Sequence, residues 1–302
     1  MTAQWPEQPG FMRSPNIATD ADLYEIENLA ADPDRTVERT MQRIAPWSGK
    51  VVIDVGAGTG FHLDRFHDAA AHVIAVEPDP ALRIRMMRRI TDNRLERTSV
   101  IGAIAVDIPL RDHCVDIVHS RFAYFFGPGC EPGIAELKRI VRPGGAAFII
   151  DNDLRSGTFA SWIHAGYPDR PLDHDEIESF WTDQGFTITR LESSWSFDNR
   201  DDLEWVVHLE FPADKAARFV ADHPSNEIEY NLLLIHRTFA PLIGSPLDTS
   251  LTTTAGTRQV VSGPGARRIS ITETQCANSS SSISVGTRSA RIPRIEKGAD
   301  PW

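Results

Sequence analysis

The sequence is poor in the features that mark secreted, metal-binding and membrane-spanning proteins. Its 302 residues include three cysteines, an odd number whose wide spacing fits neither a disulfide framework nor a zinc site (Cys114, Cys130 and Cys276). No apolar run reaches the ~18 residues of a transmembrane helix, and the N-terminal residues lack the basic and apolar segments of a secretory signal. We therefore expect a protein of the reducing cytoplasm, with no metal and no membrane partner.

Positive charge is also scarce. The chain has 31 lysine and arginine residues against 42 aspartate and glutamate residues, and its formal net charge is −11. Nucleic acids are bound mainly through basic groups that neutralise their phosphates. The composition therefore disfavours a nucleic-acid partner, and we interpret the arginines between positions 83 and 97 as a solvated helix face.

What the sequence does contain is a glycine-rich turn between two regular patterns. The apolar run Val51–Val55 predicts a buried strand, residues 56–60 read Gly-Ala-Gly-Thr-Gly, and Leu63 and Phe66 follow with helical spacing. Glycines permit a sharp turn and let a ligand lie against the backbone. The unpaired N–H groups of the helix start face the same crevice. The pattern predicts a site for a nucleotide-like cofactor.

This turn alone leaves two cofactor classes open. A dinucleotide fingerprint, G-x-G-x-x-G, would need a glycine where this chain has Phe61. Glu77, at the end of the next predicted strand, can accept hydrogen bonds from both hydroxyls of a ribose, and nicotinamide-binding folds use an acid in the same way. A nicotinamide-dependent oxidoreductase therefore stays an alternative, although residues 1–244 contain no Tyr-x-x-x-Lys pair.

Strand and helix patterns alternate through the middle of the chain. After helical patterns from Asp20 and over 33–44, we predict strands at 51–55, 72–77, 98–104, 115–120 and 146–151, with helices at 62–71, 81–90 and 132–141. Further predictions are helices at 156–166 and 173–185, a strand at 186–197, two short helices within 198–223 and a last strand at 227–239. Repeated strand–helix units favour a parallel, doubly wound α/β sheet with right-handed crossovers.

Four ordered segments together resemble the class I S-adenosylmethionine (SAM) dependent methyltransferases of the small-molecule type. They are D-V-G-A-G-T-G at 54–60, Glu77 within A-V-E-P-D, I-A-V-D-I-P-L at 104–110 followed by V-D-I-V, and E-L-K-R-I-V-R-P-G-G at 136–145. The resemblance implies a seven-stranded, mostly parallel Rossmann-like sheet. It also implies SAM as the cofactor and a small organic molecule as the methyl acceptor.

The same resemblance assigns cofactor contacts to particular residues. The glycine turn would hold the methionine part of SAM, with Asp54 near its ammonium group, and Glu77 would bind the ribose. Ile104 stands where the family commonly has an aspartate for the adenine amino group, so Ile104 and Ala105 would flank the adenine by apolar contact. The expected cofactor-binding residues are Asp54, Gly56, Ala57, Gly58, Gly60, Glu77, Pro78, Ile104, Ala105 and Ser120.

Ligands of such sheets bind at the carboxyl ends of the strands, and this places the acceptor after the fourth and fifth strands. His119 and Asp151 are the candidate general bases there, with packing as the competing interpretation of His119. Ser120 and Arg121 are expected to border the cofactor. Aromatic residues 124–126 are candidates for an apolar acceptor wall, with core packing as the competing interpretation. The family resemblance implies a helical lid over the cofactor, for which Tyr24 and Asn28 are candidates, with ordinary surface or packing roles as the alternative.

The sequence divides into an N-terminal arm and helical lid (1–45), a SAM-binding domain (46–244) and a tail (245–302). The tail holds 10 serines and 8 threonines and a net charge of +3. Such a segment buries too little apolar surface to offset its chain entropy, so we expect it to be disordered. Together with Ile104, the tail leaves a third alternative open, a methyltransferase-like protein whose site has decayed.

Overall fold

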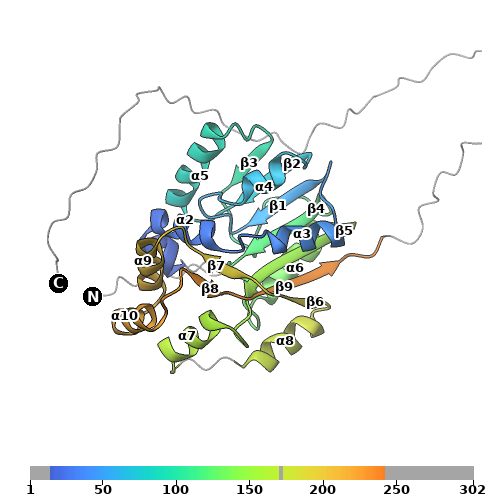
Figure 1. The fold of residues 1–302 in the computed structure, drawn as a ribbon. Helices are drawn as coiled ribbons and strands as arrows, with labels where there is room; N and C mark the ends of the chain where they lie inside the picture. Colours follow the sequence, from blue (N-terminus) through green and yellow to red (C-terminus); the bar gives the residue numbers. More distant parts are fainter. Residues whose placement is uncertain (1–13, 170–172, 242–302) are drawn as a thin grey trace, which may run out of the picture. The chain divides into compact units, whose positions relative to one another are not determined.

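A seven-stranded sheet forms the centre of the structure, a computed structural model that describes residues 14–169 and 173–241 (Figure 1). The strand order is β3-β2-β1-β4-β5-β9-β6. Neighbours from β3 to β5 are parallel, whereas β9 is antiparallel to both β5 and β6. The strands are β1 (Val51–Val55), β2 (His72–Val76), β3 (Thr98–Ile101), β4 (Val115–Arg121), β5 (Val141–Asn152), β6 (Thr187–Leu191) and β9 (Leu232–Thr238). The predicted mostly parallel α/β sheet is therefore confirmed.

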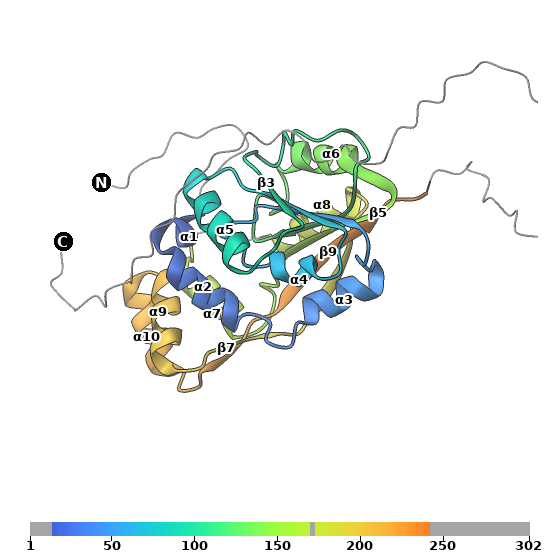
Figure 2. The ribbon, with the colours of Figure 1, turned by 90° about the horizontal axis from the view of Figure 1, so that it is seen from above.

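Helices cover both faces of this sheet, so its central strands are apolar on both sides (Figure 2). Val52 and Ile117 pack into one apolar core with α3, α4 and α5, and Ile53 and Val118 into a second core with α6 and α8. The helices are α1 (Pro15–Thr19), α2 (Ala21–Ala30), α3 (Thr36–Ile44), α4 (Leu63–His67), α5 (Pro80–Asp92), α6 (Glu131–Ile140), α7 (Thr158–Gly166), α8 (His174–Asp183), α9 (Arg200–Glu210) and α10 (Ala213–Asp222). No helix of the described residues is both long enough and apolar enough to span a membrane.

Aspartate caps fix where several helices begin. The side chain of Asp20 accepts hydrogen bonds from the N–H groups of residues 22 and 23 at the start of α2, and Asp79 caps α5 through Ala81. Asp173 accepts from the N–H of Glu176 and starts α8, as the sequence predicted. Each cap satisfies donors that would otherwise have no partner inside the helix.

Two predicted elements of the first half are too long. The predicted strand 98–104 ends at Ile101, opposite the last residue of β2, and residues 104–107 form a turn in which the N–H of Asp107 donates to the carbonyl of Ile104. The predicted helix 62–71 is the five-residue α4, because Ala71 already donates to Lys50 next to β1. Fifth-strand pairing, by contrast, begins at Val141 rather than at 146.

The predicted strands 186–197 and 227–239 are each two strands. After β6 the chain leaves the main sheet and forms β7 (Ser194–Ser196), which pairs with β8 (Glu227–Glu229) in a separate two-stranded sheet. Trp195 and Tyr230 are buried beneath this small sheet, with ring centroids 4.5 Å apart, and both contact Phe159. This aromatic cluster accounts for the break between β6 and β7. A strand that continued along the main sheet would carry Trp195 away from Tyr230 and Phe159.

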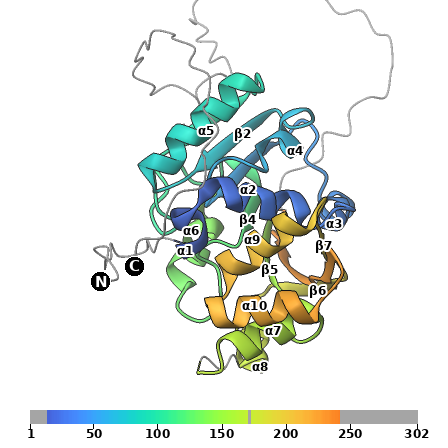
Figure 3. The ribbon, with the colours of Figure 1, turned by 60° about the vertical axis from the view of Figure 1, so that its left-hand side comes forward.

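The N-terminal helices lie against the C-terminal part of the domain. Figure 3 shows α2 beside α9, and α1 also contacts α9. Asn16 of α1 donates a hydrogen bond to Glu210 at the end of α9. The expected division at residues 45 and 46 stays a prediction, and the predicted tail lies outside the described residues.

Candidate active site

The largest described cavity, about 820 Å³, lies at the carboxyl ends of β1, β2 and β4. The chain runs from β1 outward to β3 and then returns to β4 on the other side of β1, so this is the point where the strand order reverses. Ligands of open α/β sheets bind at such a point, and the volume is in the usual range for ligand pockets. Its walls come from α1, α2, residues 55–59, 76–79 and 121–124, and Ala103 and Ala105 after β3.

The glycine turn after β1 forms one wall of the cavity, and two of its glycines leave no room for a Cβ atom. Gly56 has φ +78°, and a Cβ atom there would lie 2.3 Å from the Cβ of Ala123 in the loop after β4. Gly60 has φ +80°, and a Cβ atom would lie 2.7 Å from Cγ of Met86. Gly56, Ala57 and Gly58 line the cavity, whereas Gly60 serves the packing of the turn against α5.

Glu77 lies directly beside this turn. Its Oε2 accepts a hydrogen bond from the N–H of Gly58 at 2.9 Å, and its Oε1 accepts one from the N–H of Asp79 at 2.8 Å. Burial raises the pKa of the Glu77 carboxyl, while these two backbone N–H groups oppose the rise. Each carboxylate oxygen has a second lone pair, so Glu77 can still accept hydrogen bonds from ligand hydroxyls.

Beyond Glu77 the wall is apolar. Pro78, Leu82, Ala103 and Ala105 line it, but Ile104 does not, because its carbonyl closes the turn with Asp107. Ala103 and Ala105 thus line the cavity, whereas the sequence analysis expected Ile104 and Ala105 to do so. Sequence reasoning missed Leu82 and Ala103, since no pattern marks which residues of a turn face inward.

The wall is fixed from outside by Arg83. Its Nη1 donates to the carbonyl oxygens of Glu77 and Pro78, both at 2.7 Å. A Cβ atom on Gly102 would lie 2.9 Å from the Arg83 guanidinium carbon. This arginine therefore connects the ends of β2 and β3.

Several residues expected at the site do not line the cavity. Asp54 is buried, and its Oδ1 lies 2.7 Å from Nδ1 of the equally buried His119, on the neighbouring strand. The hydroxyl of Ser120 donates to the carbonyl of Val55 at 2.8 Å. Asp151 is half-buried on β5, and burial raises its pKa to about 7. The described structure therefore brings neither candidate base into the cavity.

The loop after β4 carries aromatic side chains on a strained backbone. Phe122 and Tyr124 have φ values of +49° and +52°, a region that residues with a Cβ atom rarely adopt. Phe122, Tyr124 and Phe126 line the cavity, whereas Phe125 is part of the core beneath the loop. Such strain concentrates at functional sites. Two of the three residues predicted to form the acceptor wall, Tyr124 and Phe126, line the cavity.

Helices α1 and α2 cover the cavity. Ile17 and Ala18 of α1 and Tyr24 and Asn28 of α2 line it, and the amide of Asn28 donates to the carbonyl of Tyr24 at 2.9 Å. Polar contacts hold α2 in place: Glu25 accepts from the hydroxyl of Thr59 and from Arg89, and Asp22 accepts from Arg85. Tyr24 and Asn28 thus line the cavity, and their role as a lid over the cofactor stays a prediction.

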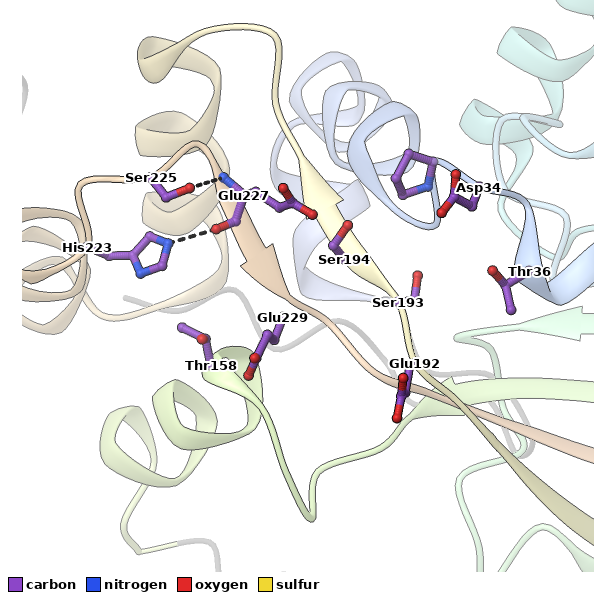
Figure 4. A pocket seen from close by; sticks show the side chains of 11 residues that line it. Asp34, Thr36, Thr158, Glu192, Ser193, Ser194, His223, Ser225, Glu227 and Glu229 are labelled. Carbon is purple, nitrogen blue, oxygen red and sulfur yellow. Dashed lines mark hydrogen bonds between the residues drawn. The ribbon is translucent and has the colours of Figure 1, made fainter.

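A second cavity, about 500 Å³, lies between the small sheet, α10 and the segment before α3 (Figure 4). Hydroxyl and acidic side chains line it, and the polar contacts within it are local. His223 Nε2 lies 2.8 Å from the carbonyl of Glu227, whose N–H donates to Ser225 Oγ at 3.0 Å. None of its lining residues belongs to the glycine turn, and the described residues contain no His/Cys/Asp/Glu group placed to hold a metal ion.

Comparison with known proteins finds methyltransferases. Residues 53–149 match the family model described as a methyltransferase domain. An uncharacterized methyltransferase of Mycobacteroides abscessus is 35% identical over 101 residues, which are 33% of this chain and 39% of the relative. A demethylmenaquinone methyltransferase of Clavibacter sepedonicus is 30% identical over 113 residues, 37% of this chain and 45% of the relative. The chain thus spans less than half the length of these relatives.

Two solved structures share the fold. The YcgJ protein of Bacillus subtilis is 15% identical, with a TM-score of 0.50 over 67% of this chain and 97% of that chain. A putative methyltransferase of Bacillus halodurans is 17% identical, with a TM-score of 0.50 over 67% of this chain and 98% of that chain. At this identity the likeness concerns the fold alone.

Proposed function

We propose that this chain, which carries a class I SAM-dependent methyltransferase domain over residues 53–149, transfers a methyl group from SAM to a small organic acceptor. The family resemblance predicted from the sequence is confirmed by the family model and the curated relatives. The acceptor and the residues that act on it belong to the proposal.

One observation carries the proposal most directly: the hydrogen bond of 2.9 Å between Gly58 and Glu77 inside the main cavity. It joins a glycine-rich backbone turn to a buried carboxylate, at the switch point of the sheet. The turn would hold the methionine part of SAM, Glu77 the ribose hydroxyls, and the apolar wall of Leu82, Ala103 and Ala105 the adenine. The residues present therefore fit this cofactor.

The protein's task in such a reaction is alignment. Bound SAM supplies a methyl group on a sulfonium that leaves readily, and proximity and orientation alone contribute about 7–11 kcal/mol. Helices α1 and α2 and the aromatic loop after β4 enclose the cavity, which keeps bulk water from the reacting groups. The remaining space between them is available to the acceptor.

Proton removal falls to His62 if the acceptor requires it. His62 lines the cavity, and its buried Nδ1 has no hydrogen-bond partner in the described residues. Burial, with the nearby Arg121 and Arg65 guanidinium groups, lowers the pKa of His62 well below its ordinary value. The imidazole is then neutral at pH 7, and its lowered pKa would make it a weak base. The sequence analysis did not give His62 this role.

The two alternative functions have less support. A nicotinamide cofactor would need glycine at position 61, where the Phe61 side chain lines the cavity instead. A decayed site would have lost the turn, the acid or the space between them, and this chain retains all three. The predicted reducing cytoplasm and the absence of a nucleic-acid partner stay predictions; one relative, from Cellvibrio japonicus, is a tRNA U34 carboxymethyltransferase.

Calorimetry with S-adenosylhomocysteine, the demethylated product, tests the cofactor assignment. We expect saturable binding, and no heat of binding at millimolar ligand would overturn the proposal. A screen of small metabolites with methyl-labelled SAM then tests the acceptor class. Transfer of label to RNA but to no small molecule would contradict that part.

A further inference from the structure

Arg121, the last residue of β4, is a buried cation that forms no ion pair with any residue that the structure describes. Its side chain lines the main cavity, and the residue is 7% exposed. The Nε and Nη1 atoms are buried and have no hydrogen-bond partner within residues 14–169 and 173–241. An unpaired buried guanidinium is costly, so its retention at a cavity wall favours a ligand whose anionic group approaches the guanidinium from the cavity.

The carboxyl groups that face Arg121 do not neutralise it. Glu38 forms its ion pair with Arg65. Glu27 of α2 and Glu210 of α9 contact each other, and burial together with this contact raises the pKa of Glu27 well above its ordinary value. Burial also raises the pKa of Glu210 to about 7. The pair therefore retains at least one proton at neutral pH.

The other titratable groups near Arg121 are neutral. Burial raises the pKa values of Tyr24 and Tyr230 above their ordinary range, so both phenols stay protonated. The imidazole of His62 is neutral because burial and Arg121 itself lower its pKa. Arg121 thus presents a positive charge to this end of the cavity, and no carboxylate of the described residues forms an ion pair with it.

The surroundings of this charge are apolar and aromatic. The Arg121 guanidinium carbon lies 5.2 Å from the centre of the Phe122 ring. Tyr124 and Phe126 extend the same wall, and Phe126 is 49% exposed at the cavity mouth. A ligand that satisfies both features has an anionic group at one end and an apolar body.

We propose that Arg121 binds the carboxylate of the acceptor, and that the acceptor is an apolar organic acid. Arginine suits this role because its planar guanidinium donates two parallel hydrogen bonds to a carboxylate. This inference rests on the methyltransferase function proposed above and names its substrate class.

The position of Arg121 separates it from the ribose end of the cofactor site. Glu77 follows β2 and Arg121 ends β4, and β1 lies between these strands. Two strand spacings put their backbones about 10 Å apart. The cavity therefore has room for an acceptor acid on the Arg121 side of the glycine turn.

A carboxylate in this cavity has two sources, the acceptor and the methionine end of the cofactor, and binding experiments distinguish them. The probes are benzoate and hexanoate, each compared with its neutral amide, with and without saturating S-adenosylhomocysteine. We expect at least one acid to bind the wild-type protein at least tenfold more tightly than its amide. Equal affinity of acid and amide for both pairs would overturn the proposal.

The variant Arg121→Gln provides the second arm. We expect it to lose at least tenfold in affinity for the acid while its affinity for S-adenosylhomocysteine stays within threefold. Loss of S-adenosylhomocysteine binding with unchanged acid binding would assign Arg121 to the cofactor and overturn the proposal. Arg155→Gln is the matched control, because Arg155 lies outside the cavity and pairs with Asp175 and Glu178.

Two further results keep this inference separate from the proposed function. If the wild-type protein does not bind S-adenosylhomocysteine, the methyltransferase proposal is wrong. The comparison of each acid with its amide in the absence of S-adenosylhomocysteine still tests whether the cavity binds a carboxylate. Removal of an unpaired buried charge is expected to raise the melting temperature, so Arg121→Gln should fold. If it does not, the comparison on wild-type protein alone decides.

Discussion

Gly56 illustrates how a single residue shapes the cavity. Its backbone has φ +78°, and a Cβ atom would meet Ala123 at 2.3 Å, so glycine is required here by both conformation and space. Gly49 has a similar φ of +69°, yet a Cβ atom there would meet nothing within 4 Å. Substitution of Gly49 therefore measures the free-energy cost of a positive φ alone, and substitution of Gly56 adds the cost of the contact with Ala123.

We expect Gly49→Ala to lower the free energy of unfolding by about 1–2 kcal/mol, the cost of a left-handed conformation. Gly56→Ala should cost about 1–3 kcal/mol more, because the loop after β4 must move away from the added methyl group. Urea unfolding of both variants measures the difference. Equal losses would show that the loop yields freely and that the close approach has no energetic weight.

Glu77 is the residue on which cofactor affinity should depend most. Hydrogen bonds to a charged group contribute about 1.5–3 kcal/mol, so we expect Glu77→Ala to weaken S-adenosylhomocysteine binding about tenfold to a hundredfold. Glu77→Gln keeps one acceptor oxygen for Gly58 or Asp79 and should lose less. Calorimetry provides the affinities, and an unchanged affinity of the alanine variant would place the ribose elsewhere.

At the same scale, the sequence showed which residues could bind a ligand but not which of them face it. The glycines and Glu77 were found because their spacing follows from one helix and one strand. Ile104 was given a contact that its neighbours make, since a turn closed by Asp107 decides the direction of each side chain. The unpaired state of Arg121 depends on α2 and α9, which are distant in sequence, and no local pattern could reveal it.

Helix α2 joins two roles, because its inner face covers the cavity and its Glu27 meets Glu210 of α9. Both carboxyls have pKa values raised by burial, so the folded state binds more protons than the unfolded chain. The contact therefore stabilises the fold fully below the ordinary glutamate pKa of about 4.3, and this contribution is lost as the pH rises through about 7.

We expect the melting temperature of the wild-type protein to fall between pH 5 and pH 8, and Glu27→Gln to flatten this decline, because an amide carries no charge when the pH rises. Thermal unfolding followed by circular dichroism at several pH values measures the slope. Glu204→Gln is the control on α9, since the Glu204 side chain is 43% exposed and pairs with Arg200. An identical slope in Glu27→Gln would exclude this pair as the cause.

Elements were predictable where the pattern is local and uncertain where pairing is distant. The buried run Val51–Val55 predicted a strand that the structure contains, and the helix predicted at 173–185 is α8. The break between β6 and β7 was not predictable, because it depends on Trp195 finding Tyr230 and Phe159 beneath a second sheet. The apolar composition of residues 186–197 alone predicts one continuous strand.

For the molecule as a whole, the sequence predicts that residues 245–302 contribute nothing to the stability of the domain. Their serine and threonine content and lack of apolar periodicity argue against a packed core. We expect a variant that ends at residue 244 to keep the melting temperature of the full chain within about 2 °C, no more than the shift that ~1 kcal/mol causes in a domain of this size. A large drop would show that the tail packs.

The cover over the cavity has a kinetic consequence. We expect a ligand beneath Ile17 and Tyr24 to leave faster when α1 and α2 move aside, and release of product often limits turnover. The pairs Asp22–Arg85 and Glu25–Arg89 resist that motion, and the Asp22 side chain is 83% exposed to dissolved ions. Because salt screens such pairs, higher ionic strength should shorten the dwell time of S-adenosylhomocysteine. Stopped-flow measurements of its departure would reveal this, with Asp22→Asn expected to blunt the effect.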